Sequence, residues 1–121
     1  MATHLETGKK GEELAAEYLL HKGYKILHKN WRNRQYEIDL VARDGDNLVV
    51  VEVKTRHSPS LVEPEFAVDK QKQKLLVRAA NSYVLKHGIN LNTRFDIIAI
   101  TIHEEQAHIH HIPDAFYPTM R

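Results

Sequence analysis

Two pairs of charged residues near the middle of the chain have the types and spacing that phosphate chemistry requires. Glu37 and Asp39 lie two residues apart in one apolar run, and Glu52 and Lys54 lie two apart in the next. Alternate side chains of a β-strand point to opposite faces, so each pair shares one face of its strand. Carboxylate oxygens are ligands of hard divalent ions such as Mg²⁺, and a lysine beside them can stabilise charge on a phosphoryl oxygen.

A short turn sequence predicts that the two strands form a hairpin. Asp44-Gly45-Asp46-Asn47 separates the runs, and its glycine stands where a type II′ turn requires one. Counting back from a pair between the two ends of this turn places Asp39 opposite Glu52, and Glu37 opposite Lys54. Like charges directly opposed across a ladder are destabilising. The two opposed carboxylates therefore require a cation, a shared proton or a water between them.

A surface hairpin with ordinary salt bridges is the alternative to a metal site. The apolar run at residues 48–51 argues against an exposed strand, because one of its valines falls on the charged face. A carboxylate flanked by valines in a central strand is rarely left unpaired. The pattern therefore favours Asp39 and Glu52 as metal ligands, with the backbone carbonyl of Val53 as a further oxygen donor. The opposite face of both strands is predicted as core: Ile38, Leu40, Val49, Val51 and Val53.

Composition narrows the class of protein. A chain of 121 residues predicts one domain with a real core. The absence of cysteine excludes disulfides, thiolate metal sites and cysteine nucleophiles. No apolar stretch approaches the roughly 20 residues that span a bilayer, and residues 1–10 lack the apolar core of a signal peptide. We therefore expect no membrane partner, no export and a cytoplasmic location.

Hydrophobic periodicity and turn residues predict an α/β chain. The expected order is α-β-β-β-α-β, with a possible last strand, and it favours a mixed central sheet flanked by helices. The expected elements are a helix at 7–21, strands at 24–27, 36–43 and 47–55, a loop at 57–66, a helix at 69–86, and strands at 95–102 and 108–112.

Five short motifs occur in fixed order within residues 8–56. They are Gly8-Lys9-Lys10-Gly11-Glu12-Glu13-Leu14-Ala15, Tyr24-Lys25-Ile26-Leu27, Asn30-Trp31-Arg32, Glu37-Ile38-Asp39-Leu40-Val41 and Val51-Glu52-Val53-Lys54-Thr55-Arg56. Together they resemble the YraN-like family of small bacterial proteins. That family is similar to archaeal Holliday junction resolvases and to the wider PD-(D/E)XK nuclease superfamily. The resemblance implies a single restriction-endonuclease-like domain over residues 1–121.

The resemblance also implies metal-dependent hydrolysis of phosphodiester bonds, with Mg²⁺ or Mn²⁺ as cofactor. The superfamily aspartate falls on Asp39, and the glutamate and lysine of the E-x-K element fall on Glu52 and Lys54. The acidic residue of the first helix falls on Glu12, with Glu13 as the alternative. The hairpin register above leaves two roles for Glu37. It either contacts the metal ligands without binding the metal itself, or pairs with Lys54.

Basic and amide residues are expected to form a track for a nucleic-acid backbone. Cations at a helix N-terminus oppose the macrodipole, and a bound phosphate removes that conflict. The alternative is a solvated basic face partly balanced by Glu63, Glu65 and Asp69. The members of the track are Lys9, Lys10, Arg32, Arg34, Arg56, Lys70, Lys72, Gln73 and Lys74, with Arg78 and Gln71 near its end.

Three functions remain open from these residues. The first is a metal-dependent endonuclease acting on nucleic acid, with DNA, including branched or structured DNA, as the expected substrate. The second is a nucleic-acid-binding module that keeps the nuclease fold with little or no catalysis. The third is a protein-interaction domain with a relict site. A homodimer would suit a two-fold substrate, but no apolar dimer stripe is readable in the sequence.

Overall fold

The elements occur in the predicted order, with both β-strands present at the C-terminal end. The computed structural model describes residues 4–58 and 68–118, with the side chains of the first helix described from Gly8 onward. The predicted loop at 57–66 therefore lies mostly outside the described residues. Neither described helix has the length and apolarity that a membrane span needs. The elements are α1 His4–His21, β1 Lys25–Asn33, β2 Tyr36–Asp44, β3 Asn47–His57, α2 Lys70–His87, β4 Asn92–His103 and β5 Gln106–Phe116.

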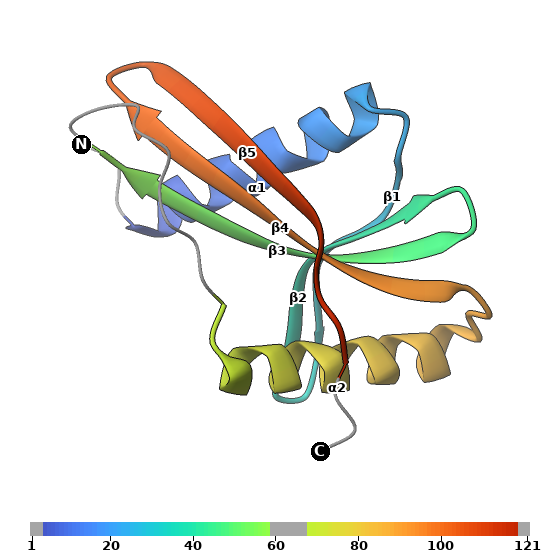
Figure 1. The fold of residues 1–121 in the computed structure, drawn as a ribbon. Coiled ribbons are helices and arrows are strands. Elements are labelled where there is room, and N and C mark those ends of the chain that lie inside the picture. The colour runs from blue at the N-terminus through green and yellow to red at the C-terminus, as the bar shows by residue number, and fades with distance from the viewer. Residues whose placement is uncertain (1–3, 59–67, 119–121) are drawn as a thin grey trace.

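The five strands form one mixed sheet in the order β1-β2-β3-β4-β5. All neighbouring strands are antiparallel except β3 and β4, which are parallel. A parallel pair requires a crossover connection, and α2 provides it. In Figure 1, α1 and α2 lie on different sides of the strongly twisted sheet. This architecture confirms the predicted mixed α/β fold and is consistent with a restriction-endonuclease-like core.

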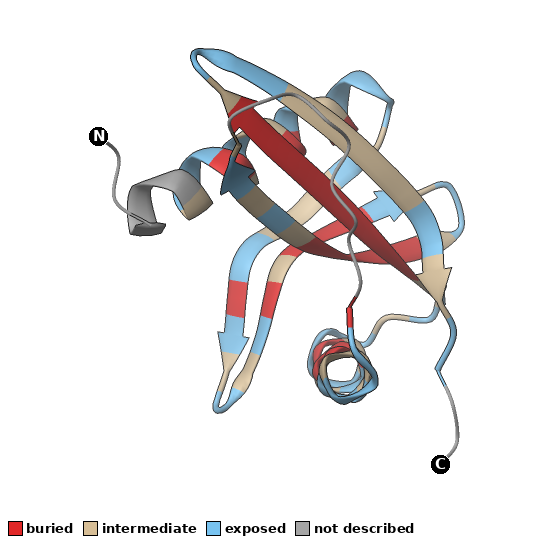
Figure 2. Cartoon of the chain, turned by 60° about the vertical axis from the view of Figure 1, so that its left-hand side comes forward, coloured by how far each residue is buried: buried red, intermediate tan, exposed pale blue. Residues whose placement is uncertain are grey.

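Each helix buries its own apolar cluster against the sheet. On the α1 side, Ala15 and Leu19 pack with residues of the central strands, among them Val51 and Ile100. On the α2 side, the buried helix residues are Leu76, Ala79, Ala80 and Tyr83. Figure 2 shows that β4 is buried along most of its length, whereas β5 at the sheet edge is mostly of intermediate exposure. The central strands therefore form a rigid platform between two cores.

Ile38 is buried as predicted, but it packs on the other side of the sheet from the one predicted. Leu40 packs on the α1 side, but Ile38 packs on the α2 side together with Trp31. The β2–β3 ladder ends at the Leu40–Val51 pair, and Asn30 in the neighbouring β1 has a φ of 51°. Because β2 leaves β3 at this point and twists with β1, strict alternation along β2 breaks down beyond it.

A buried polar network is centred on Asp96 of β4, opposite Val51 in the β3–β4 ladder. The Asp96 side chain is fully buried and accepts hydrogen bonds from Arg94 Nε at 2.9 Å and from the Asp114 N–H at 3.0 Å. His111 Nε2 lies 2.7 Å from its other oxygen. Burial alone would raise the pKa of Asp96, but its hydrogen bonds to His111, Arg94 and Asp114 outweigh burial and lower that pKa. Arg94 also reaches the Tyr24 hydroxyl at 2.7 Å, so the network joins β4 and β5 to the start of β1.

Replacing Asp96 should therefore destabilise the protein strongly. We expect Asp96→Ala to lower the free energy of unfolding by about 3–5 kcal/mol, because it leaves the Arg94 charge buried without its carboxylate. Urea denaturation followed by circular dichroism measures the change. Asp46→Ala at the exposed turn is the matched control and should change stability by less than about 0.5 kcal/mol. A similar small change for both variants would show that the network contributes little to stability.

Candidate active site

The candidate site lies where β2 and β3 separate. The predicted hairpin register holds as far as the Leu40–Val51 pair, where the ladder ends. The extended ladder predicted that Asp39 and Glu52 would be opposite each other. That pairing is absent, because the ladder stops one residue earlier. Instead, Asp39 Oδ2 accepts a hydrogen bond from the Val53 N–H at 2.8 Å. The carboxylate takes the place of a main-chain acceptor, and this fixes Asp39 beside the carboxylate of Glu52.

Glu52 is the most perturbed acid of this region. It is only 8% exposed although it carries a carboxyl group. Burial, the neighbouring charge of Asp39 and a side-chain hydrogen bond to Asp39 raise the pKa of Glu52 to about 7, against the opposing effects of Lys72 and Lys54. Lys72 Nζ lies 3.6 Å from Glu52 Oε2. Two acids held together under these conditions favour a shared proton or a cation between them.

Lys54 and Glu37 lie apart from each other. Glu37 pairs with Arg32 Nε at 3.3 Å, across the β1–β2 ladder in which these two residues are neighbours. The predicted Glu37–Lys54 ion pair is therefore wrong, because the end of β2 that bears Glu37 follows β1 and not β3. Lys54 is exposed on β3, two residues from Glu52, and its charge lowers the pKa of that acid. The lysine thus lies beside the carboxylate pair as predicted from strand alternation.

Glu12 approaches the pair from α1. Burial raises the pKa of Glu12, and the charges of Asp39 and Glu37 raise it further while Arg32 lowers it. Glu13, the alternative at this position, is exposed. Glu12 is therefore the acid of this helix that interacts with the site.

A glycine brings α1 close enough to β3 to place Glu12. A Cβ atom added at Gly11 would overlap Thr55 Oγ1 and lie 2.8 Å from Thr55 Cβ. Only the absence of a side chain at this position allows the contact between helix and strand. The sequence pattern alone does not reveal this role, because the contact depends on how α1 crosses the sheet.

The carboxylate pair is the feature that the structure brings together. Among the described side chains, which are those of residues 8–58 and 68–118, no group of three or more Asp, Glu, His or Cys residues is arranged closely enough to hold a metal ion. The N–H of Val53 contacts Asp39, whereas a ligand role for the Val53 carbonyl stays a prediction.

The predicted basic residues are divided among several elements. Lys9 and Lys10 are exposed. Because α1 begins at His4, they lie beyond the first turn of the helix and not at its N-terminus. Arg34 is exposed at the β1–β2 turn with a φ of 57°. Arg56 is exposed near the end of β3. Arg32, as described, pairs with an acid of β2.

The basic and amide residues predicted on α2 lie on two sides of the helix, one toward the carboxylate pair and one toward a separate cavity. Lys72 points to the carboxylate pair, an ion pair that the sequence pattern did not predict because it placed Lys72 in the nucleic-acid track. Lys70, Gln73 and Lys74 line a separate cavity on another side of the helix. Gln73 donates a side-chain hydrogen bond to the Val68 carbonyl at 2.9 Å, so part of its role is to hold the start of the helix.

The fold and this site define a class: a mixed-sheet protein, consistent with a restriction-endonuclease-like core, in which a buried and a half-buried carboxylate lie together beside a lysine. The chain belongs to the UPF0102 family, described as an uncharacterised protein family, whose profile matches residues 11–100. This range contains the site residues Glu12, Glu37, Asp39, Glu52 and Lys54. The resemblance to the YraN-like family is thereby confirmed.

Relatives of similar length match nearly the whole chain. A UPF0102 protein of Bacteroides thetaiotaomicron is 46% identical over 120 residues, covering 99% of both chains. One from Flavobacterium psychrophilum is 45% identical over 117 residues, covering 97% of this chain and 98% of its own. One from Syntrophus aciditrophicus is 44% identical, covering 96% and 92%.

The close approach at Gly11 leads to a paired prediction. We expect Gly11→Ala to destabilise the protein, because its methyl group overlaps Thr55, and to displace Glu12 from Asp39. Gly8→Ala is the matched control: a Cβ there meets nothing within 4 Å, and alanine should stabilise the helix by up to about 1 kcal/mol. Thermal unfolding of both variants measures the difference. Equal melting temperatures would show that the helix does not need to approach β3 closely.

The raised pKa of Glu52 predicts how stability depends on pH. The folded protein keeps the Glu52 proton up to about pH 7, whereas the unfolded chain loses it near 4.5, the ordinary pKa of a glutamate. The free energy of unfolding should therefore fall as pH rises through this window, by on the order of 2–3 kcal/mol. Urea denaturation from pH 5 to 8 should show this fall in the wild type relative to Glu52→Gln. Glu37→Gln is the exposed control and should keep the pH dependence of the wild type. If the difference in free energy of unfolding between wild type and Glu52→Gln does not change with pH, the raised pKa of Glu52 is refuted.

Proposed function

We propose that this protein is a metal-dependent nuclease that hydrolyses phosphodiester bonds in DNA, including branched or structured DNA. The observation that supports this most directly is the buried Glu52 next to the half-buried Asp39, with Lys54 beside them. Two acids at such short range are costly to bury in their charged form unless a cation joins them. A lysine next to them supplies a positive charge at the place where a phosphate would bind.

The donor set fits a hard divalent ion. Asp39 and Glu52 would hold Mg²⁺ or Mn²⁺, with the Val53 carbonyl as a further oxygen ligand and Glu12 as a ligand or as a partner of the bound water. When bound, such an ion lowers the pKa of a coordinated water and neutralises charge on the scissile phosphate. Imidazole and thiolate ligands, which other metals prefer, are not part of this donor set.

The protein's own side chains complete the proposed chemistry. Lys54 orients the attacking water or stabilises the negative charge that develops on a phosphoryl oxygen. Lys72 neutralises Glu52 when no cation is bound. With a divalent ion in that role, the Lys72 ammonium would be available to contact a phosphate of the substrate. The ion pair thus keeps the buried acid partly compensated until metal and substrate arrive.

A nucleic-acid-binding module with the same fold and little catalysis is the second candidate. The Lys72–Glu52 ion pair favours it, because a carboxylate that already has a partner does not need a metal. Basic residues on both helices and on β3 would then carry the function by phosphate contacts alone. Such binding is steeply salt-dependent and does not require Mg²⁺.

A cleavage screen separates the two candidates. Linear, single-stranded, flap and four-way DNA are incubated with the protein in Mg²⁺ or Mn²⁺. We expect cleavage that Asp39→Asn and Glu52→Gln each reduce at least about 100-fold, a loss typical of a group that acts on developing charge. Lys54→Ala should slow cleavage while metal binding, measured by calorimetry, remains. Asn at position 39 keeps an oxygen acceptor for the Val53 N–H, so the fold should persist.

Exposed acids outside the site serve as matched controls. Glu13→Gln and Asp46→Asn remove a carboxylate from exposed positions and should leave cleavage unchanged. Retained cleavage in purified Asp39→Asn protein would refute the nuclease assignment. Tight, salt-sensitive binding with no cleavage in either metal would support the binding module instead.

A further inference from the structure

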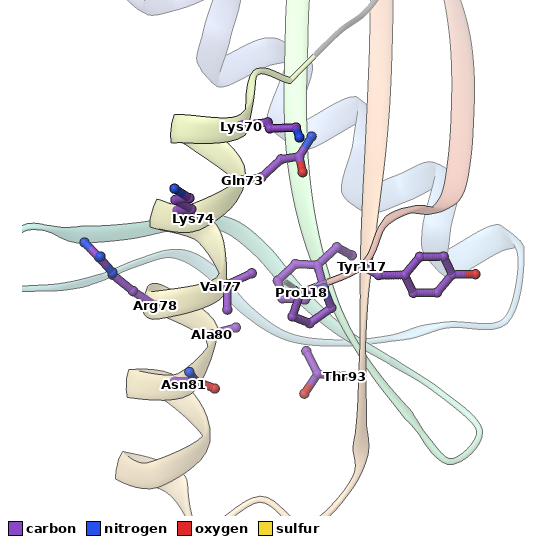
Figure 3. Close-up of a pocket in the computed structure, with 11 residues that line it drawn as sticks. Lys70, Gln73, Lys74, Val77, Arg78, Ala80, Asn81, Thr93, Tyr117 and Pro118 are labelled. Carbon is purple, nitrogen blue, oxygen red and sulfur yellow. The ribbon is translucent and has the colours of Figure 1, made fainter. Parts of the chain in front are cut away.

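A hollow lies beside α2, and neither acid of the carboxylate pair lines it. It has a volume of about 490 Å³ and lies between α2, the start of β4 and the chain that follows β5. This volume is within the range of small-molecule sites, about 300–1,000 Å³. Figure 3 shows Val77 and Ala80 pointing from the helix toward Pro118, whereas the Arg78 guanidinium points away from Pro118. The hollow therefore has an apolar interior and a polar rim.

The rim carries a row of three cations. Lys70, Lys74 and Arg78 are spaced four residues apart, which places them along one side of α2. Each four-residue step advances about 6 Å, so the row is about 12 Å long. None of the described residues that line the hollow is acidic. Within the described part of the chain, none of the three has an ion-pair partner, in contrast to Lys72 on the same helix.

The apolar interior is formed by different elements from those of the rim. Val77 lies on α2, and Phe95 lies on β4 with its ring stacked on Phe116 at 5.0 Å between centroids. Pro118 closes the opposite side. Amide groups of Gln73 and Asn81 are the uncharged polar groups of α2 at this hollow. A ligand suited to it has a flat, largely apolar part with hydrogen-bonding edges and an anionic part that stays near solvent.

We infer that this hollow binds one unpaired nucleotide of a nucleic-acid strand, with the base inside and the backbone phosphates along Lys70, Lys74 and Arg78. A base in a duplex is stacked on both sides and cannot enter, whereas a single-stranded base can be splayed into a protein surface. The inference rests on the proposed function in one respect, because it names a substrate with an unpaired stretch next to the cleaved bond. The two sites use different side chains of α2: Lys72 contacts Glu52, whereas Lys70, Gln73 and Lys74 line the hollow.

Charge at the rim is tested by binding without metal. Fluorescence anisotropy compares a 15-nucleotide single strand with the blunt 15-base-pair duplex of the same sequence, in EDTA, over a range of salt. For Lys74→Gln/Arg78→Gln we expect at least tenfold weaker binding of the single strand. The slope of log affinity against log salt should decrease by about 1.4, since each lost contact on single strands contributes about 0.7. Lys25→Gln/Lys86→Gln removes the same charge from exposed positions elsewhere and should leave the preference for single strands intact.

The interior is tested by filling it. Val77→Phe places a larger side chain in the hollow, and Val84→Phe is the matched control, one further half-buried valine on α2 outside the hollow. We expect Val77→Phe to weaken single-strand binding about tenfold, as loss of one stacked base does. It should also abolish competition by thymidine 5′-monophosphate, which in the wild type would report a free nucleotide in the same place. Competition only by oligonucleotides would show that the site needs a continuous strand.

Thermal unfolding verifies that each variant is folded. Equal effects on the single strand and the duplex, or equal effects of each variant and its control, would overturn the inference. The proposed nuclease function fails separately: if the wild type cuts no DNA but Val77→Phe still loses single-strand binding, the hollow retains its role. If DNA is cut and the hollow variants bind and cut single-stranded and flap DNA normally, only the inference about the hollow is wrong.

Discussion

The separation of β2 from β3 is the constraint on which the rest of this structure depends. At that point the Val53 N–H loses its main-chain acceptor on β2, and the Asp39 carboxylate replaces it at 2.8 Å. The same event brings this acid against Glu52, which is almost fully buried on the central strand. One side chain thus serves as the backbone acceptor and, in the proposed function, would also be a metal ligand. As a consequence, two acids lie together where water is largely excluded. Burial and the charge of Asp39 therefore raise the pKa of Glu52.

Both helices act on this pair from opposite faces of the sheet. α1 approaches β3 through the contact between Gly11 and Thr55, which sets Glu12 near Asp39. α2 supplies Lys72 as a counter-charge, and its cations Lys70, Lys74 and Arg78 line the hollow on another side of the helix. The buried network around Asp96, which lies opposite Val51 in the β3–β4 ladder, holds β4 and β5 beside the central strand that bears Glu52.

The sequence predicted those features that depend on local rules. Strand alternation, the turn around Gly45 and the apolar face of α2 yielded the element order, the register near the turn and the Asp39–Glu52–Lys54 neighbourhood. It failed where three-dimensional twist overrides alternation: the ladder stops at Leu40, and Glu37 pairs with Arg32 and not with Lys54. The role of Gly11 and the direction of Lys72 depend on helix crossing, which no local pattern encodes.

Calorimetric titration of divalent ion into the protein at pH 7, in two buffers of different ionisation enthalpy, tests the central claim most directly. If Asp39 and Glu52 form a cation site that holds a proton near neutral pH, Mg²⁺ or Mn²⁺ should bind once per chain and release protons, because metal ligands must be deprotonated. Both the binding and the proton release should disappear in Glu52→Gln. Binding without proton release, binding that survives in Glu52→Gln, or no binding in the wild type would contradict the account.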